Sequence, residues 1–423
     1  AGGLTHRYYF NDNTVLKTTL ASTYSKFDAK QFVRDFDGNS TIYGDLYNRT
    51  GNWIASTSLS KKYSSRFTNK TGFTFQHMTY KMNLEKAPYE GEPLESMSQG
   101  EGNTNLISGY TTSSYDINDK VTFNFGLNGQ YLTLNDKWTL EPRLSVKWKA
   151  TQKASWALAY GLHSRMEKID VYFVKTPALG NNNKVNKNLD FTKAHHVMLS
   201  YNYKISDDMN LRIEPYFQYL CDVPVIADSS YCVLNRDEFY VEDALVNKGR
   251  GQNIGIDVTF EKYLSKGYYY MATTTLFNSR YRGGDGKWYN TKFNRNYVLN
   301  LLGGKEWLTG KNKNRIWSVN LRCVLQGGDR YSPIDEAATM ADPDKIVQYN
   351  EYKAYSKQFD PIFMFHYTVS YRINLKGKSH EFAIKAMSTG KEYYGHSYNY
   401  KTGKIDADRQ DGGISNISYK FEF

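Results

Sequence analysis

Strict alternation of apolar and polar side chains is the feature that most constrains the fold, and it is clearest between Gly251 and Trp307. The first run of this stretch alternates apolar Ile254, Ile256, Val258 and Phe260 with polar or small Asn253, Gly255, Asp257, Thr259 and Glu261. Successive side chains of a strand point to opposite faces, so this run has one apolar face and one polar face. A soluble sheet packed on a core alternates in the same way, so alternation alone does not separate water from membrane.

The spacing of the turns separates the two environments. A four-residue turn, Leu264–Gly267, is followed by a long strand, Tyr268–Arg280, and then by a longer glycine-rich loop, Arg282–Lys292. Short turn, long strand, long loop, long strand is the period of an up-and-down outer-membrane barrel. The sequence therefore predicts an all-β fold, an antiparallel up-and-down transmembrane β-barrel, with about seventeen strands in this chain and one domain over residues 1–423.

Two neighbouring runs show which face should meet lipid. We expect these apolar side chains to face lipid: Val121, Phe123, Phe125, Trp138, Leu140, Leu144 and Val146. Charged side chains are costly in lipid, so we expect their alternating neighbours to face a wet lumen: Thr122, Asn124, Glu141, Arg143 and Lys147. Pro142 lacks an amide hydrogen and should mark a bulge or the outer end of its strand.

A second set of polar residues alternates with apolar ones later in the chain, and we expect it to face the lumen: Arg212, Glu214, Asp257, Glu261 and Arg322. These residues could contact a plug or a substrate. Ion pairing among themselves, which would keep the lumen wall solvated and rigid, is the more common role for such residues.

Composition excludes a helical membrane protein. The mean hydropathy is −0.65, and no apolar run approaches the about eighteen residues that a spanning helix needs. Aromatic residues make up 16% of the chain, with 37 Tyr and 22 Phe, which suits the aromatic girdles of a barrel at its two interfaces. A Tyr-rich soluble β-sandwich or a soluble carbohydrate-binding module is the alternative.

Charge and cysteine content restrict partners and covalent links. The formal charge of +11 fits a basic rim that contacts lipopolysaccharide phosphates, a basic lumen, or an imbalance left by sequence outside this chain. Scattered Lys and Arg without a concentrated patch or a known motif argue against nucleic acid as a partner. Cys221 and Cys232 flank a predicted outer loop, where they could pair or remain two free thiols.

Four short segments resemble the late barrel strands of TonB-dependent outer-membrane receptors of the Bacteroides type: Lys248–Asn253, Glu261–Leu264, Asn290–Asn294 and Gly303–Glu306. The terminal Phe423, after alternating aromatics, resembles the signal by which such barrels are recognised for assembly. The resemblance implies a barrel of about twenty-two strands behind a plug. We therefore expect this chain to be the carboxy-terminal portion, with the plug and first strands preceding Ala1 and no full ladder between the strands at Leu4 and Ile417.

The resemblance also implies a function. It implies a receptor in the bacterial outer membrane that binds scarce cargo at extracellular loops and imports it with energy from the TonB complex, through a plug outside these residues. Outer-membrane lipid, lipopolysaccharide, a surface lipoprotein and a small-molecule or oligomeric cargo are the implied partners. Glycan, siderophore, corrinoid, peptide and metal chelate stay open as cargo. A passive porin and a barrel-anchored adhesin are the alternatives.

Candidate ligand contacts lie in the outer loops. Three loops should share the extracellular side: Asp222–Arg250, Gly327–Gln358 and Gly390–Gly413. Their aromatic residues could stack on cargo, although loop packing is the more common role: Tyr349, Tyr352, Tyr355, Tyr393, Tyr394, Tyr398 and Tyr400. No catalytic constellation, cofactor motif or paired metal spacing is present, since adjacent His195 and His196 should face opposite sides of a strand. The acidic loop Glu85–Gly102 should be solvated, with Ca²⁺ binding as the alternative.

Overall fold

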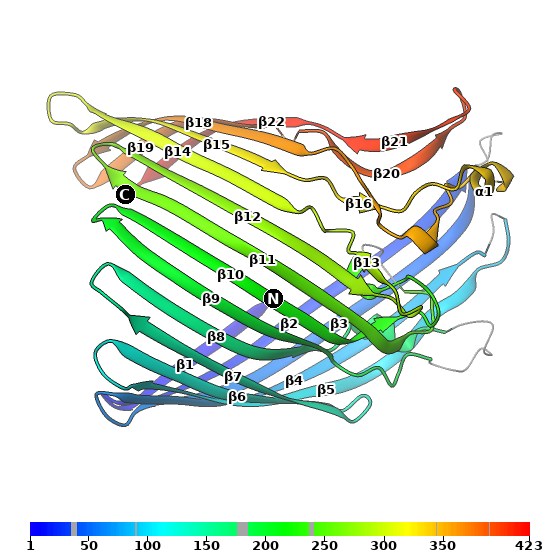
Figure 1. Cartoon of the computed structure of the whole chain (residues 1–423), viewed down its shortest axis with the longest axis horizontal. Coiled ribbons are helices and arrows are strands. Elements are labelled where there is room, and N and C mark those ends of the chain that lie inside the picture. The colour runs from blue at the N-terminus through cyan, green and yellow to red at the C-terminus, as the bar shows by residue number, and fades with distance from the viewer. Residues whose placement is uncertain (35–39, 89–90, 176–184, 237–240, 344, 389) are drawn as a thin grey trace.

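A single antiparallel sheet, rolled into a barrel wall, dominates the computed structural model (Figure 1). The structure describes residues 1–423 except 35–39, 89–90, 176–184, 237–240, 344 and 389. Each long strand pairs with the one before it and the one after it in the sequence. Among the described residues, no helix combines the length and the apolarity needed to cross a membrane.

The long strands are β1 (Gly2–Asn11), β2 (Thr14–Arg34), β3 (Ser40–Lys62), β4 (Phe67–Lys86), β5 (Glu95–Asp116), β6 (Val121–Leu132), β7 (Lys137–Lys149), β8 (Ala154–Arg165), β9 (Thr192–Ser206), β10 (Met209–Val225), β11 (Val246–Ser265), β12 (Tyr268–Arg282), β14 (Tyr297–Thr309), β15 (Arg315–Gln326), β18 (Ile362–Leu375), β19 (Lys378–Ser388) and β22 (Gly413–Glu422). Smaller elements lie in the connections: η1 (Ile169–Phe173), η3 (Val233–Asn235), β13 (Trp288–Asn290), β16 (Arg330–Tyr331), α1 (Glu336–Ala341), η4 (Glu351–Lys353), β17 (Lys357–Gln358), β20 (Glu392–Asn399) and β21 (Lys404–Gln410).

The strand count and order confirm the predicted all-β up-and-down architecture. The main sheet has 18 strands, one of which is the three-residue β13 inside a loop, so the remaining seventeen are the long strands. At its two edges, β1 pairs with β2 and β22 pairs with β19, and no pairing joins β1 to β22 in the described part of the chain. The twenty-two-stranded barrel with a plug stays a prediction.

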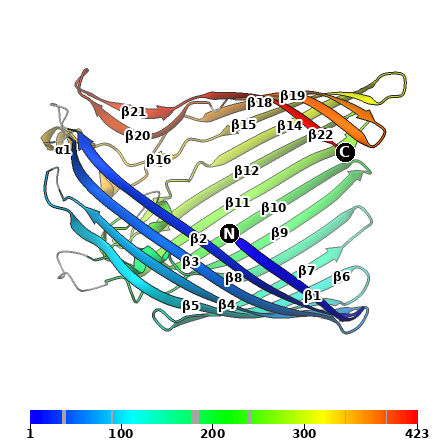
Figure 2. The same cartoon turned by 180° about the vertical axis from the view of Figure 1, so that it is seen from behind.

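Short turns gather at one end of the wall and long connections at the other (Figures 1 and 2). At the turn end, β11 continues to Ser265, so the predicted four-residue turn is wrong and a two-residue turn stands in its place. Its residues, Lys266 and Gly267, have φ of 53° and 78°, as in the type I′ turns that match the twist of paired strands. The three loops predicted to share a side all lie at the loop end.

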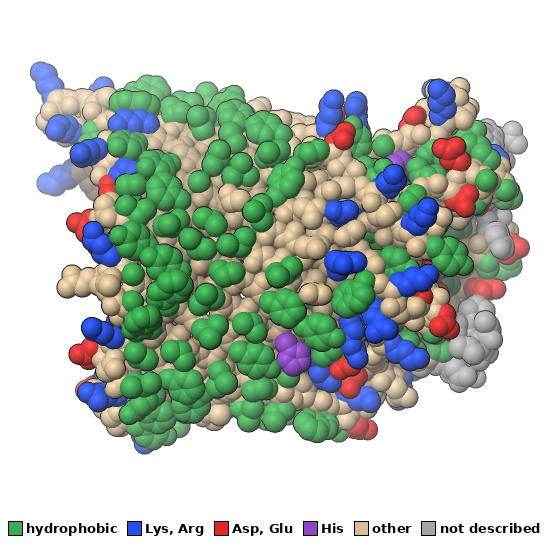
Figure 3. Space-filling view, in the orientation of Figure 1, with side chains coloured by type: hydrophobic (Ala, Val, Ile, Leu, Met, Phe, Trp, Pro, Cys, Tyr) green, Lys and Arg blue, Asp and Glu red, His purple; other side chains and the backbone are tan. Residues whose placement is uncertain are grey.

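The outward face of the wall carries a broad apolar band (Figure 3). On β7, Trp138 is 68% exposed and Leu144 is 47% exposed, whereas Glu141 between them is 1% exposed on the opposite face. The alternation predicted for this strand is therefore present. Apolar side chains exposed outward on every second position are what a wall surrounded by lipid requires.

Two local expectations differ from the structure. Pro142 causes no register shift in the β6–β7 ladder, so the first of its two expected roles, a bulge, is wrong. It lies one residue beyond the last β7–β8 pair, Arg143–Gly161, at the outer end of that ladder but within β7. The acidic loop is shorter than expected, because β4 runs to Lys86 and β5 begins at Glu95. Glu101 accordingly lies on a strand, 2.9 Å from the Lys81 ammonium on β4.

Candidate functional site

The connection between β8 and β9 folds back against the wall at the loop end. Its η1 segment buries Val171, Tyr172 and Phe173 against apolar residues of β4. Phe173 packs on Gly100 so closely that an added Cβ would lie 2.7 Å from its Cδ1, so this position on β5 needs glycine. A backbone bridge between Ser98 and Val174 extends the contact. The loop is thus held in place by side chains on the inner face of the wall.

A buried ion pair links this connection to the next one. The Asp170 carboxylate on η1 lies 3.1 Å from the Arg236 guanidinium in the β10–β11 connection, and both side chains are less than a tenth exposed. Nearby, the Tyr172 hydroxyl accepts a hydrogen bond from the Glu167 amide, and burial raises the pKa of Tyr172. Two charges buried together require each other, because either alone would remain uncompensated.

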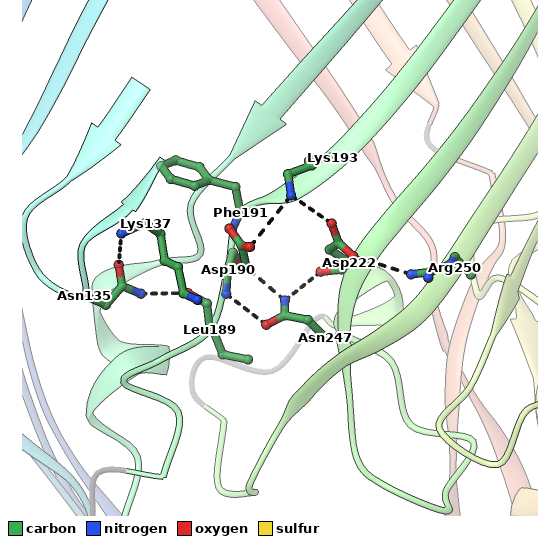
Figure 4. Close-up of polar contacts among 9 residues, drawn as sticks. All are labelled: Asn135, Lys137, Leu189, Asp190, Phe191, Lys193, Asp222, Asn247 and Arg250. Carbon is green, nitrogen blue, oxygen red and sulfur yellow. Dashed lines mark hydrogen bonds and ion pairs between the residues drawn. The ribbon is translucent and has the colours of Figure 1, made fainter. Parts of the chain in front are cut away.

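A polar network fixes the β8–β9 connection to the β6–β7 turn and to the neighbouring strand ends (Figure 4). Asn247 on β11 accepts from the Asp190 amide at 2.9 Å and donates to the Asp222 carbonyl at 2.7 Å. The Lys193 ammonium lies 2.9 Å from the Asp222 carboxylate. Asn135, in the β6–β7 turn, donates to the Leu189 carbonyl at 2.7 Å. One network therefore joins the β6–β7 turn, the β8–β9 connection and the loop ends of β9, β10 and β11.

A second apolar cluster lies under the β10–β11 and β15–β18 connections. It buries Val223, Val225, Cys232, Tyr281 and Tyr289. The Tyr281 hydroxyl donates to the Ser230 carbonyl at 2.8 Å, and burial raises the pKa of the Cys232 thiol to about 12. Two of the long connections thus fold onto the inner wall instead of projecting freely.

Below these loops, the inner wall has a hollow of about 890 Å³. Its polar lining includes Arg143, His163, His196, Gln218 and Asn253. The His163 and His196 rings meet edge to face, with centroids 4.9 Å apart. His195 instead hydrogen-bonds the Tyr160 hydroxyl at 3.0 Å on the other face, so the two adjacent histidines do point apart as expected. The hollow offers hydrogen-bond donors, one cation, Arg143, and one carboxylate, Asp257.

Glu141, two residues before Arg143 on β7, is almost completely buried. Its carboxylate accepts hydrogen bonds from Asn128, Gln130 and Ser164, and it pairs with Arg143 at 2.8 Å. The β7–β8 ladder ends at the pair Arg143–Gly161, so the carboxylate bonds to Ser164 where backbone pairing has stopped. The side chain joins the diverging ends of β6, β7 and β8.

The other residues predicted for the lumen stand on the face opposite the apolar band. Arg212 and Glu214 form an ion pair at 3.2 Å. Asp257 accepts from Thr275 at 2.7 Å and borders the hollow, and Glu261 accepts from Tyr263 at 2.8 Å. Arg322 donates to Asn300 at 3.0 Å. Most of these charges are therefore satisfied by uncharged neighbours.

The predicted loop tyrosines separate into different surroundings. Tyr349 and Tyr393 join a cluster with Tyr331, Phe359 and His396, here called the loop aromatic cluster. Tyr355 packs on Tyr281. The remaining ones lie toward solvent or against each other: Tyr352 is 83% exposed, Tyr394 is 60% exposed, and Tyr398 contacts Tyr400 with ring centroids 5.1 Å apart.

His396 lies at the centre of the loop aromatic cluster, on the β20–β21 hairpin. Its ring stacks on Phe359 at 5.2 Å, and its Nδ1 lies 3.4 Å from the Tyr349 hydroxyl. Burial among these rings lowers the pKa of His396 below its usual 6.5, and nearby Asp408 opposes the shift. The hairpin is thereby packed on the β15–β18 connection. The sequence showed aromatic loops but gave no signal for this hairpin contact.

Neither a disulfide nor a metal-ligand group is present in the described part of the chain. Cys221, Cys232 and Cys323 are free thiols. No group of three or more His, Cys, Asp or Glu side chains gathers as a ligand set among the residues placed by the structure.

Comparison with known proteins identifies the fold. No protein-family model matches the sequence, and no curated protein sequence matches it. Among solved structures, the ferric yersiniabactin uptake receptor FyuA from Yersinia pestis matches 100% of this chain at 10% identity, with a TM-score of 0.66. The siderophore receptor PiuA from Acinetobacter baumannii matches 99% at 12% identity, with a TM-score of 0.65. This chain spans 61% and 63% of those two proteins, respectively, and shares their fold.

Proposed function

We propose that the protein is a TonB-dependent outer-membrane receptor that binds scarce small-molecule cargo at its loop end and imports it actively. The observation that carries the proposal is the wall itself. Seventeen consecutive strands form a wall with apolar side chains exposed outside, and β5 to β12 line a hollow on its inner face, beneath loops folded over the loop end. We further propose that it is a receptor of the Bacteroides type, because the four segments between Lys248 and Glu306 resemble that type.

The cargo that we propose is an anionic metal chelate of the siderophore kind. Two structural neighbours are the siderophore receptor PiuA and the ferric yersiniabactin uptake receptor FyuA. In this chain, Arg143, which also pairs with Glu141, and His163 and His196 supply positive or protonatable groups to the hollow. Side-chain amides add hydrogen-bond donors, and Asp257 is the one carboxylate of the lining. Charge-assisted hydrogen bonds of this kind favour anionic oxygen ligands.

The loop aromatic cluster and the exposed Tyr352 and Tyr394 are the proposed first contacts. Aromatic faces bind flat or ring-shaped ligands and lose little side-chain entropy on binding. The lumen-facing pair Arg212–Glu214 lies deeper along the wall, toward the turn end, and is proposed to keep that surface wetted.

Uptake of a radiolabelled ferric chelate by cells separates this function from its alternatives. We expect uptake to depend on the protein, to stop when an uncoupler removes the proton-motive force, and to fall at least tenfold in Arg143→Gln, as expected when a charged contact worth about 1.5–3 kcal/mol is lost. Lys149→Gln, at the turn end of the same strand, is the matched control.

Two results would contradict the proposal. Uptake that persists after uncoupling would indicate a passive porin. Cells that bind to surfaces through the protein but accumulate no chelate in any form tested would indicate a barrel-anchored adhesin.

A further inference from the structure

Near the loop end, the outward face of four neighbouring strands changes from apolar to more polar residues at one level, and on β9, β11 and β12 these include Lys or Arg. The outward positions of β9 run from Leu199 and Val197 to His195 and Lys193, and those of β10 run from Phe217 to Tyr219. On β11 they run from Ile254 to Gln252 and Arg250. On β12 they run from Leu276 to Asn278, Arg280 and Arg282. Figure 3 shows Lys and Arg side chains gathered on this side of the apolar band, over the loop ends of these strands. Lys193, Arg250, Arg280 and Arg282 are here called the basic wall patch.

The patch concentrates like charges that a sheet normally keeps apart. Arg250 and Arg282 are direct partners across β11 and β12. Directly opposed like charges destabilise a sheet, so such a pair calls for an anion. Asp222 lies 2.9 Å from Lys193 and 3.7 Å from Arg250, and one carboxylate therefore serves both cations.

The two β12 arginines have no acidic partner within the described residues. The Arg282 Nε donates to the Gly286 carbonyl at 2.8 Å, which leaves its charge uncompensated. Both Arg280 and Arg282 are exposed on the outside of the wall. Their guanidinium groups are suited to bidentate binding of phosphate.

The position of the patch identifies the anion. It lies immediately beyond the apolar band, where the polar headgroups of the surrounding leaflet would begin. We propose that the basic wall patch binds the phosphate groups of a phosphorylated glycolipid in the outer leaflet. This inference rests on the proposed function in one respect, namely that the loop end of the barrel faces outward.

Lipid binding to the purified protein in detergent, measured by native mass spectrometry, tests the proposal. The probes are a bisphosphorylated lipid A, the same lipid after enzymatic dephosphorylation, and inorganic phosphate. We expect the double variant Arg280→Gln/Arg282→Gln to bind the bisphosphorylated lipid about thirtyfold more weakly, which corresponds to about 1 kcal/mol for each basic residue removed. Lys311→Gln/Lys376→Gln, which removes two exposed lysines at the turn end, should bind as the unmodified protein does.

Several results would overturn the proposal. Equal binding of the dephosphorylated lipid, an equal loss in the turn-end control, or no loss in the double variant would each exclude a phosphate site at the patch. Displacement of the lipid by equimolar inorganic phosphate would assign the patch to free phosphate. If the double variant does not fold, Arg280→Lys/Arg282→Lys keeps the charge and should retain part of the binding. The experiment needs no cargo, so its failure would leave the uptake result unaffected.

Discussion

At the scale of single residues, Glu141 shows how a charge is kept inside a barrel wall. Its side chain is almost completely buried, and its carboxylate accepts hydrogen bonds from three neutral side chains and pairs with one guanidinium. A buried charge is tolerated when partners replace its hydration. The Glu141 side chain thus links β6, β7 and β8 by hydrogen bonds at the point where backbone pairing between β7 and β8 ends.

Replacing Glu141 with alanine should strongly destabilise the protein. The change removes an acceptor shared by several buried donors, so we expect the free energy of unfolding to fall by about 3–5 kcal/mol. Ser145→Ala, which removes a hydroxyl with one partner, Asn124, should cost about 1 kcal/mol. Urea unfolding followed by tryptophan fluorescence in detergent micelles measures both. Equal effects of the two changes would contradict the role assigned to Glu141.

At the scale of elements, β7 has one face toward lipid and the other face toward the lumen. Leu144 points outward and Ser145 points into the hollow, although they are adjacent. A lysine at position 144 should cost about 2–4 kcal/mol if it sits near the bilayer midplane. A lysine at position 145 should cost much less, because it would enter a wet lumen. Folding of the two variants into lipid vesicles, scored by unfolding free energy, checks the difference; a larger cost at Ser145 would reverse the assigned faces.

The β20–β21 hairpin should respond to pH through His396. Because its pKa in the folded protein lies below the usual 6.5, the packed hairpin binds a proton less readily than the released one. The stabilisation is therefore present above pH 6.5 and is lost as the pH falls below it. We expect hydrogen exchange in residues 392–410 to accelerate between pH 7.5 and 5.5, after correction for intrinsic exchange.

A variant without a titrating ring provides the control for this prediction. His396→Phe keeps an aromatic contact with Phe359 and should exchange at a rate independent of pH after the same correction. An identical pH response in the variant would show that another group controls the hairpin.

At the scale of the whole molecule, the two ends of the wall differ in what they can do. Strands return through short turns at one end, whereas the connections at the other contain η1, α1 and the β20–β21 hairpin. If the loop end faces outward, protease added to intact cells should cut within residues 327–361 and 389–412 and spare the turn at Lys266. Mass spectrometry of released peptides locates the cuts. Cleavage confined to Lys266 or Gly377 would place the loop end inside the cell envelope.

The features that could be predicted from the sequence are those set by residues close together in the chain, whereas contacts between distant residues could not be predicted. The faces of β6 and β7 depend on period-two alternation, which is local, and the predicted order of strands and loops was confirmed. The His163–His196 contact needs the register that sets His196 opposite Gly161, and alternation does not specify register between strands. The docking of Phe173 on Gly100 joins residues distant in sequence, so it too was missed.

The pairing of each long strand with its neighbours in sequence has a consequence for how the wall assembles. Such a sheet has a low contact order, because its ladders close across short separations, and folding can proceed hairpin by hairpin. The slower closures are the ones across the long connections, since each doubling of loop length adds about 0.6 kcal/mol of entropic cost. The β15–β18 connection, about four doublings longer than the turn at Lys266, would carry about 2.5 kcal/mol more. We expect docking of its inner elements on the wall to offset that cost, so that loop packing at the mouth influences the order in which strands join.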